Sequence, residues 1–358
     1  MLDRDIEPAL SVTPSPWIGT YAGEGGGGLY PLTGTTGSLA VGPPYRDASN
    51  ASFGVHASRF DLHYLADEQD IGRLGVHRRT SSGWHRLGSV ATEGAAPCHV
   101  AIDATQSCIA VANYGNGGIA VYRLDQNSGM PIIPPMVYVN DGRGPDPDRQ
   151  ESPHAHWVGF SPDNRTLYAT DLGTDAVLAF AFDAQSGTIG SVQTAFRAAP
   201  GSGPRHMLFH DSQPGLAYLV CELDSTLVTL DIDGTGNGSV ELRERATLPT
   251  IPAGWSGHSI LAHIGANAAG DRLYVSNRGH DSIAVFALDA RGDATPIQHI
   301  TSGGVSPRFF MILEEEARMM VVHERDHRVT MLDILADGTL ASTGNAITVP
   351  GAAFALIG

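Results

Sequence analysis

Cationic and titratable side chains recur behind a proline at the start of predicted strands. The four prolines that open this element are 56, 51 and 103 residues apart. The last spacing spans two units, so the repeating unit has roughly 51 residues. If the units surround one axis, these side chains converge, and arginine with histidine suits a substrate that carries an anion or a carbonyl group. The copies are Pro97-Cys98-His99, Pro153-His154-Ala155-His156, Pro204-Arg205-His206, Gly257-His258, which lacks the proline, and Pro307-Arg308.

His154 and His156 are candidates for a general acid or base, because an imidazole titrates near neutral pH. They flank Ala155 at the start of a predicted strand, where alternation would place both side chains on one face. The alternative is a pair of buried histidines that only hydrogen-bond the next unit. A His-x-His pair without a third ligand does not define a metal site, so no metal and no organic cofactor is predicted.

Three arginines are candidates for substrate binding. Arg205, Arg278 and Arg308 each lie among small and apolar residues at the start or end of a predicted strand. A buried guanidinium at such a place requires a carboxylate partner or an anionic ligand. Among the histidines of the repeat, we expect His206 and His258 to contact the substrate as well.

Glu222 is the candidate carboxylate and the second candidate for the general base. It ends an apolar run, so we expect either a raised pKa or an arginine partner. The alternative is a turn-capping role, because turn-forming residues dominate the positions predicted to match it in other units. These positions are Asn113, Asp171, Asn277 and Glu324.

Predicted β-hairpins position these side chains. Each hairpin consists of two short runs of β-branched or aromatic residues on either side of Asn, Asp and Gly. One strand precedes each hairpin and a poorer one follows it, which gives about seven units of four strands, within the range of propeller blades. Without sustained 3.6-residue periodicity, helices should be scarce. Clear hairpins cover 109–122, 167–180, 217–230, 273–286 and 319–332, and weaker ones cover 17–30 and 60–76.

The fold is therefore predicted to be all-β, a seven-bladed β-propeller of four-stranded antiparallel blades. Residues 1–358 form one domain, in which residues 1–16 are an irregular N-terminal extension. Residues 354–357 are a candidate strand that closes the ring by pairing with the N-terminal segment. The stretch 139–152, rich in Gly, Pro and Asp, precedes His154 and is expected to form either a lid over the site or a disordered excursion.

Composition excludes several classes of function. A net charge of −16 argues against a general surface for nucleic acid or anionic membranes. All 22 side chains counted as lysine or arginine are arginines, which excludes Schiff-base lysine chemistry and the phosphate-loop lysine. Cys98, Cys108 and Cys221 have no metal-ligand spacing and are expected to be reduced. With no secretory signal and no apolar run of ~20 residues, we expect a cytoplasmic protein; the sequence specifies no oligomeric state.

Several motifs occur together in an order that is similar to a known family. Pro153-His154-Ala155-His156 is followed by Phe160-Ser161-Pro162-Asp163 and by the acidic turn at 170–175. Further matches lie at 18–21, 111–115, 203–206, 222–226 and 274–279. The combination resembles the bacterial-type lactonases with a seven-bladed propeller, which include the propeller 6-phosphogluconolactonases and the fungal carboxy-cis,cis-muconate lactonising enzyme. It extends from about residue 17 to about residue 310, with poorer matches at 33–66 and 254–263.

The resemblance implies a site built from His154 or His156 with Arg205, Glu222 and Arg278, to which the repeat adds Arg308. It implies metal-independent hydrolysis of a sugar-acid or related anionic lactone, with Glu222 or a histidine activating water and the arginines polarising the carbonyl. Two alternatives stay open. A muconate-type cycloisomerase would form a lactone with the same arginines, and a non-catalytic propeller would bind a small acid or a peptide.

Overall fold

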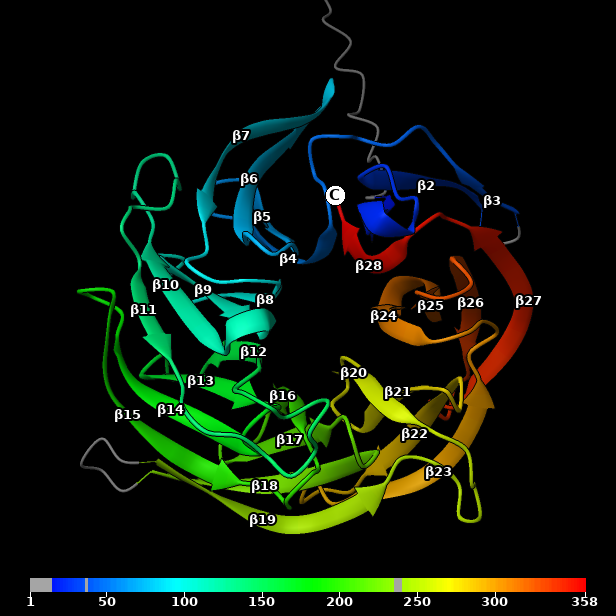
Figure 1. Cartoon of the computed structure of the whole chain (residues 1–358). Coiled ribbons are helices and arrows are strands. Elements are labelled where there is room, and N and C mark those ends of the chain that lie inside the picture. Colours follow the sequence, from blue (N-terminus) through cyan, green and yellow to red (C-terminus); the bar gives the residue numbers. More distant parts are fainter. Residues whose placement is uncertain (1–14, 36–37, 235–239) are drawn as a thin grey trace, which may run out of the picture.

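The computed structural model describes residues 15–35, 38–234 and 240–358, which form a ring of seven four-stranded antiparallel sheets (Figure 1). The predicted fold is confirmed. The inner strand of each sheet contacts the inner strands of both neighbouring sheets, so these strands surround one axis. We number the sheets as blades 1 to 7 in the order of their inner strands, which are β4 (Ala51–Ala57), β8 (Pro97–Ile102), β12 (Ala155–Phe160), β16 (Pro204–Phe209), β20 (Ile260–Ala266), β24 (Pro307–Leu313) and β28 (Ala352–Ile357).

The other strands follow outward in each blade. The second strands are β5 (Leu62–Asp67), β9 (Cys108–Asn113), β13 (Thr166–Asp171), β17 (Leu216–Cys221), β21 (Arg272–Arg278), β25 (Arg318–His323) and β1 (Pro16–Thr20). The third strands are β6 (Arg73–Thr80), β10 (Gly118–Arg123), β14 (Ala176–Asp183), β18 (Thr226–Gly234), β22 (Ser282–Leu288), β26 (Arg328–Ile334) and β2 (Leu29–Thr35). The outermost strands are β7 (Gly83–Ala91), β11 (Met136–Val139), β15 (Thr188–Arg197), β19 (Val240–Pro249), β23 (Ala294–Thr301), β27 (Leu340–Thr348) and β3 (Ser38–Val41).

Helix is confined to single turns in the described part of the chain, as the sequence predicts. Three 3-10 turns occur, η1 (Ala22–Glu24), η2 (Tyr114–Asn116) and η3 (Glu314–Glu316). Across the described ranges, therefore, no helical segment has the length and apolar character that a membrane span requires.

The ring closes between the two ends of the chain. In blade 7, β28 pairs antiparallel with β1, with Leu356 opposite Trp17 and Phe354 opposite Gly19. The closing strand predicted at 354–357 is confirmed. Pro16 already belongs to β1, so the predicted extension is shorter by that residue, and its residues 1–14 lie outside the described part of the chain.

The hydrophobic core is divided among the seven gaps between blades. Each of seven buried clusters joins two neighbouring sheets, such as Trp157 of blade 3 with Met207 and Leu219 of blade 4. A middle strand therefore has both faces covered, and such strands are expected to be apolar throughout rather than alternating. The second strand Leu216–Cys221 is buried at every residue, which places Glu222 directly behind an apolar run.

A bulge at the start of the inner strand redirects one side chain in several blades. Between Pro204 and His206, two residues of β16 face one step of β17, so Arg205 is the extra residue. The same irregularity makes Cys98, His156 and Arg308 the extra residues of their strands. Bulges are frequent beside active sites because they turn a side chain out of the ladder. These four residues lie at the same end of the axis, where inner strands begin and second strands end; we call this end the site face.

Candidate active site

Glu222 lies at the centre of three arginines on the site face. Its Oε2 accepts hydrogen bonds from Nε of Arg205 at 2.7 Å and from Nη2 of Arg278 at 2.9 Å. Its Oε1 accepts a bond from Nη2 of Arg149 at 2.5 Å. The structure thus brings together three of the predicted residues, Glu222, Arg205 and Arg278, and adds a fourth that the sequence analysis missed.

The arginines keep the Glu222 carboxyl ionised. Burial by itself would raise its pKa, but Arg278, Arg205 and Arg149 outweigh burial and hold the pKa far below the usual range. The sequence alternative of an arginine partner is therefore confirmed, and a raised pKa is excluded. Burial also lowers the pKa of the Arg205 guanidinium to about 10, so Arg205 stays charged at neutral pH.

Turn chemistry fixes the ends of the two strands that carry Arg205 and Glu222. Gly203 adopts φ of +66°, a left-handed conformation that glycine tolerates, and its carbonyl accepts the Glu222 N–H at 2.7 Å. Its own N–H donates to Oδ1 of Asp175 at 2.8 Å. Because Asp175 belongs to blade 3, the neighbouring blade locks the backbone of blade 4 at the site.

Arg308 occupies a second charged cluster on the same face. Its guanidinium lies 3.5 Å from Glu68 and 3.4 Å from Glu324, and it covers the ring of Tyr21, whose hydroxyl donates to Glu68 at 2.7 Å. Arg278 joins the two clusters, because its Nη1 lies 3.7 Å from Glu324. Arg308 is therefore paired with carboxylates in this structure, as a buried guanidinium requires.

His156 is the predicted histidine that faces Glu222. Its Nε2 lies 4.0 Å from Oε2 of Glu222, and its Nδ1 lies 3.9 Å from the Cys98 thiol. Burial, reinforced by Arg205, lowers the pKa of His156 well below its ordinary value, so the imidazole is neutral at neutral pH. Burial likewise raises the pKa of the Cys98 thiol, which makes this cysteine an unsuitable nucleophile.

His206 lies beneath Arg205 and supports it. Nη1 of Arg205 is 3.1 Å from Nε2 of His206, and because a guanidinium only donates, Nε2 must accept. The proton of His206 is then on Nδ1, which lies 3.4 Å from Nδ1 of His263. His206 is thus placed against Arg205 and His263, together with rings of Phe53 and His99 around the axis, rather than beside Glu222.

His154 and His156 both pack against the ring of Tyr114, but their imidazole nitrogens have different partners. His154 precedes β12 and stacks on Tyr114 with ring centroids 4.5 Å apart, and its Nδ1 lies 2.8 Å from the Tyr114 carbonyl oxygen. Its Nε2 is 3.4 Å from Glu151. The predicted shared face rested on regular alternation, which the bulge at His156 breaks, and His154 lies just before the strand.

His258 lies at the rim of the site. It lines a cavity of about 260 Å³ whose inner wall is formed by Arg278 and Glu324, and Arg325 stands at the same cavity. The structure therefore brings His258 near the arginine clusters without a direct contact to Glu222.

The register corrects the predicted match of Glu222 to other blades. Cys221, not Glu222, lies opposite the first residue of its inner strand, as Asn113 and Asp171 do in their blades. Glu222 is one residue further along, so only Glu324 among the predicted matches is correct.

The residues that directly follow the second strands form a ring around the axis on the site face. In blade 5 the equivalent residue is Arg278, which is the last residue of β21 itself. The other members of the ring are Tyr21, Glu68, Tyr114, Leu172, Glu222 and Glu324. Aligning the hairpins on this ring would have revealed Glu68 and the two tyrosines.

Arg149 could not be found by the repeat, because it lies in the long loop between blades 2 and 3. Gln150 anchors that loop: its side-chain amide donates to Oδ1 of Asp175 and to the Leu172 carbonyl, each at 2.8 Å. The neighbouring Arg149 then reaches both Glu222 and the Tyr114 hydroxyl, at 3.3 Å from the latter. The stretch 139–152 is thus fastened to the site face, so the disordered excursion is wrong, and a lid over the site stays a prediction.

The family model described as lactonase, 7-bladed beta-propeller, matches residues 15–357. The chain belongs to this lactonase family. The 6-phosphogluconolactonase of Bacillus subtilis is 29% identical over 335 residues, which cover 89% of this chain and 93% of that protein.

Solved structures of similar proteins share the whole lactonase propeller. A protein from Lactobacillus plantarum has a TM-score of 0.86 at 29% identity, covering 96% of this chain and 98% of its own. A periplasmic gluconolactonase from Pseudomonas aeruginosa has a TM-score of 0.85 at 25% identity, with the same two shares covered. Within the described ranges of this lactonase-family chain, no group of three or more His, Cys, Asp or Glu side chains is placed to hold a metal ion.

Replacing Arg149 with alanine should lower kcat/KM for lactone hydrolysis by about 10- to 100-fold, the value of one charge-assisted hydrogen bond. The fold should tolerate the change, because Glu222 keeps Arg205 and Arg278 as partners and a third of the Arg149 side chain is exposed. Steady-state kinetics with thermal unfolding checks both parts. Arg143→Ala, in the same loop, is the matched control, and equal kinetics for the two variants would contradict a role for Arg149.

Proposed function

We propose that the chain hydrolyses a sugar-acid lactone without a metal or organic cofactor. The observation that supports this most is the convergence of Glu222, Arg149, Arg205 and His156 at one point of a propeller that belongs to the lactonase family. Cations fixed in a largely buried site stabilise the negative charge that develops on a carbonyl oxygen during acyl transfer. A lactone is a cyclic ester and requires this stabilisation when water attacks it.

His156 is the proposed general base. Its neutral imidazole can accept a proton from the water that attacks the carbonyl carbon, and can return that proton to the ring oxygen when the C–O bond breaks. The product is then the open hydroxy acid. Glu222 is less suited to this step, because hydrogen bonds from the three arginines occupy both of its carboxylate oxygens. Its proposed role is to hold the arginines and to orient His156.

Arg149 is the proposed donor to the substrate. Its side chain is 33% exposed, against 2% for Arg205 and 10% for Arg278. Its Nε and Nη1 have no hydrogen-bond partner among the described residues, whereas Nη2 is engaged by Glu222 and Tyr114. Arg149 can therefore meet the carbonyl oxygen or the acid group of a lactone, while the buried arginines supply a fixed positive field.

The charge of the two clusters favours a lactone that brings one negative charge, rather than several, to the reacting centre. Four guanidiniums face the three carboxylates of Glu68, Glu222 and Glu324, so one positive charge is in excess. A muconate-type cycloisomerase would have to place several substrate carboxylates beside these glutamates, which is unfavourable. A phosphate on the far end of the sugar, as the Bacillus subtilis relative suggests, would reach the cavity rim at His258 and Arg325.

Proton release during the hydrolysis of a lactone panel tests this proposal. The panel contains glucono-δ-lactone, 6-phosphogluconolactone and a muconolactone, each with and without EDTA, and the spontaneous rate is subtracted. We expect turnover of at least one sugar lactone that EDTA does not reduce. No enzyme-dependent proton release from any lactone would contradict the proposal and favour a binding propeller.

The cytoplasmic location expected from the sequence stays a prediction, since one similar structure is of a periplasmic protein.

The pH dependence of kcat/KM should lack an inflection near pH 6.5, the ordinary pKa of histidine. The pKa of His156 is lowered by burial and by Arg205, so the base form persists at a pH where an exposed histidine would be protonated. We therefore expect a constant kcat/KM from about pH 8 to about pH 6 and a fall only at more acid pH. If kcat/KM shows an inflection at pH 6.5 and the His156→Gln variant retains it, the general base is another group.

A further inference from the structure

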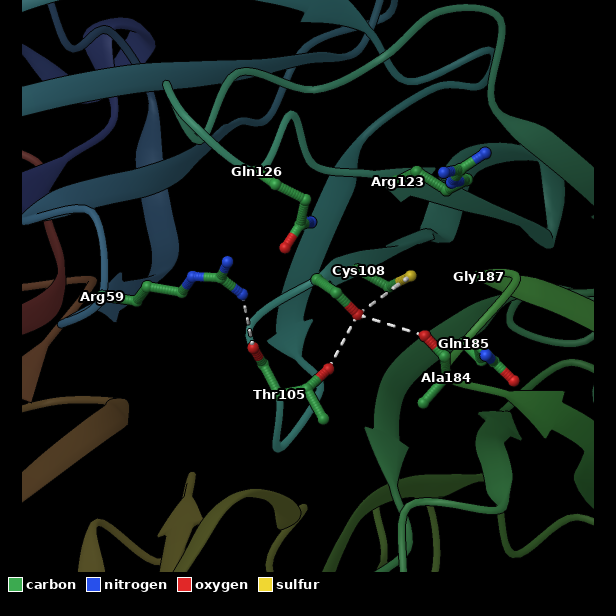
Figure 2. A pocket seen from close by; sticks show the side chains of 9 residues that line it. Arg59, Thr105, Cys108, Arg123, Gln126, Ala184, Gln185 and Gly187 are labelled. Carbon is green, nitrogen blue, oxygen red and sulfur yellow. Dashed lines mark hydrogen bonds between the residues drawn. The ribbon is translucent and has the colours of Figure 1, made fainter.

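A second cavity opens at the end of the blades opposite to the site face (Figure 2). Its volume is about 300 Å³, at the lower end of the range for small-molecule sites. Its walls come from the turn between β8 and β9, the connection from β10 to β11 and the turn between β14 and β15. Arg59 joins them from the turn between β4 and β5, so three blades contribute to one cavity.

Among the described residues, two guanidiniums and no carboxylate line this cavity, in a chain whose net charge is −16. Figure 2 shows Arg59 and Arg123 on opposite sides, with the amide of Gln126 between them. Nη1 of Arg59 donates to the Thr105 carbonyl at 3.3 Å, and neither arginine has an ion-pair partner among the described residues. Guanidinium groups at the wall of a cavity are donors that carboxylate and phosphate groups prefer.

The hydroxyl and amide groups between the arginines present lone pairs. The Thr105 hydroxyl donates its proton to Oδ2 of Asp103 at 2.6 Å. The Ser107 hydroxyl lies 2.7 Å from the Thr105 oxygen, and because the Thr105 proton is already used, Ser107 is the donor in that contact. Nε2 of Gln126 donates to the Leu124 carbonyl at 2.8 Å, which leaves its Oε1 free toward the cavity. These acceptors suit the hydroxyl groups of a ligand.

Asp103 lies behind the cavity wall, and its charge is satisfied within the protein. Its Oδ1 accepts the N–H groups of Ser107 and Cys108 at 2.7 Å each, and its Oδ2 accepts the side chain of Asn164 at 2.9 Å. Those bonds hold the carboxylate away from the arginines. Gly187 completes the opposite wall, because a Cβ there would lie 2.6 Å from Cγ of Arg123.

We propose that this cavity binds a hydroxylated small molecule that carries an oxyanion, either a carboxylate or a phosphate monoester. The oxyanion pairs with Arg59 or Arg123, and the hydroxyl groups donate to Gln126 and Ser107. The inference stands apart from the proposed lactonase activity, because none of these residues belongs to the site face.

Isothermal titration calorimetry at low ionic strength tests the proposal with four probes. Gluconate represents a hydroxylated carboxylate, glucose 6-phosphate a hydroxylated phosphate monoester, inorganic phosphate an anion without carbon-bound hydroxyls, and glucose the uncharged sugar. Each probe is titrated into the wild type, Arg59→Gln, Arg123→Gln and the matched control Arg165→Gln. Arg165 is also exposed at this end of the blades but does not line the cavity.

We expect gluconate or glucose 6-phosphate to bind, with at least a tenfold loss of affinity in Arg59→Gln and Arg123→Gln and no loss in Arg165→Gln. The comparison of the two probes identifies the oxyanion. Because both arginines are exposed, the variants should fold, and unchanged lactone kinetics would separate this cavity from the site face. Equal affinity in all four proteins would show that the probe binds outside this cavity and would overturn the proposal. No binding of either hydroxylated anion, or equally tight binding of inorganic phosphate, would overturn it as well.

Discussion

Glu222→Gln should reduce kcat/KM for lactone hydrolysis by at least about 100-fold and lower the free energy of unfolding by about 3–5 kcal/mol. The glutamine retains the shape of the side chain but removes the only negative charge that three arginines share. Arg205 and Arg278 are buried, so Arg205 would lose its carboxylate partner, while Arg278 would keep Glu324 at 3.7 Å. Urea denaturation measures the stability, and proton release below the unfolding transition measures the activity.

Glu241→Gln is the control for the loss of one carboxylate. Its side chain is 60% exposed and lies 3.7 Å from Arg243 on the surface, where an ion pair contributes about 0–1 kcal/mol. A Glu222→Gln protein as stable as this control would show that the buried arginines do not depend on the carboxylate. A stable variant that also kept its turnover would remove Glu222 from the proposed site.

The sequence reveals the blades because their physical requirements are local. A hairpin such as 167–180 needs apolar strands and a turn of Asp, Gly and Thr, and both are visible without any tertiary information. The same holds for Arg205, because a cationic or titratable side chain behind a proline recurs with the period of the fold. Closure by 354–357 follows because a propeller must pair its two ends, and β28 pairs with β1 as expected.

The details of the site depend on register and on contacts between distant segments. One extra residue at His156 interrupts the alternation after His154, and the residues around a bulge do not clearly indicate it in the sequence. The match of Glu222 to the turn residues failed by one position, because the sequence did not fix the residue at which each second strand ends. The position of Arg149 depends on a loop that Gln150 anchors to blade 3, and no repeat or period in the sequence indicates such a contact.

Arg205→Lys should lower kcat/KM by at least about 100-fold although it preserves the charge. The Arg205 guanidinium donates in three directions, to Glu222 at 2.7 Å, to His206 at 3.1 Å and to the Ala262 carbonyl. A lysine has a compact ammonium in place of this planar fork, so it cannot hold all three partners in one plane. Steady-state kinetics of the variant measures the loss, and Arg165→Lys on the opposite end of the blades is the matched control.

The absence of lysine from the chain makes this variant informative beyond its rate. The introduced group would be the only side-chain amine, so an NMR titration of isotopically labelled lysine would report the site alone. Burial and the charge of Arg278 lower the pKa of Arg205, and the same causes should lower the pKa of the amine below the ordinary value of about 10.4. A variant with lowered pKa and lost activity would show that the shape of the guanidinium, and not its charge, is required. Full activity with the amine would mean that a point charge suffices, and the proposed requirement for the planar guanidinium would be wrong.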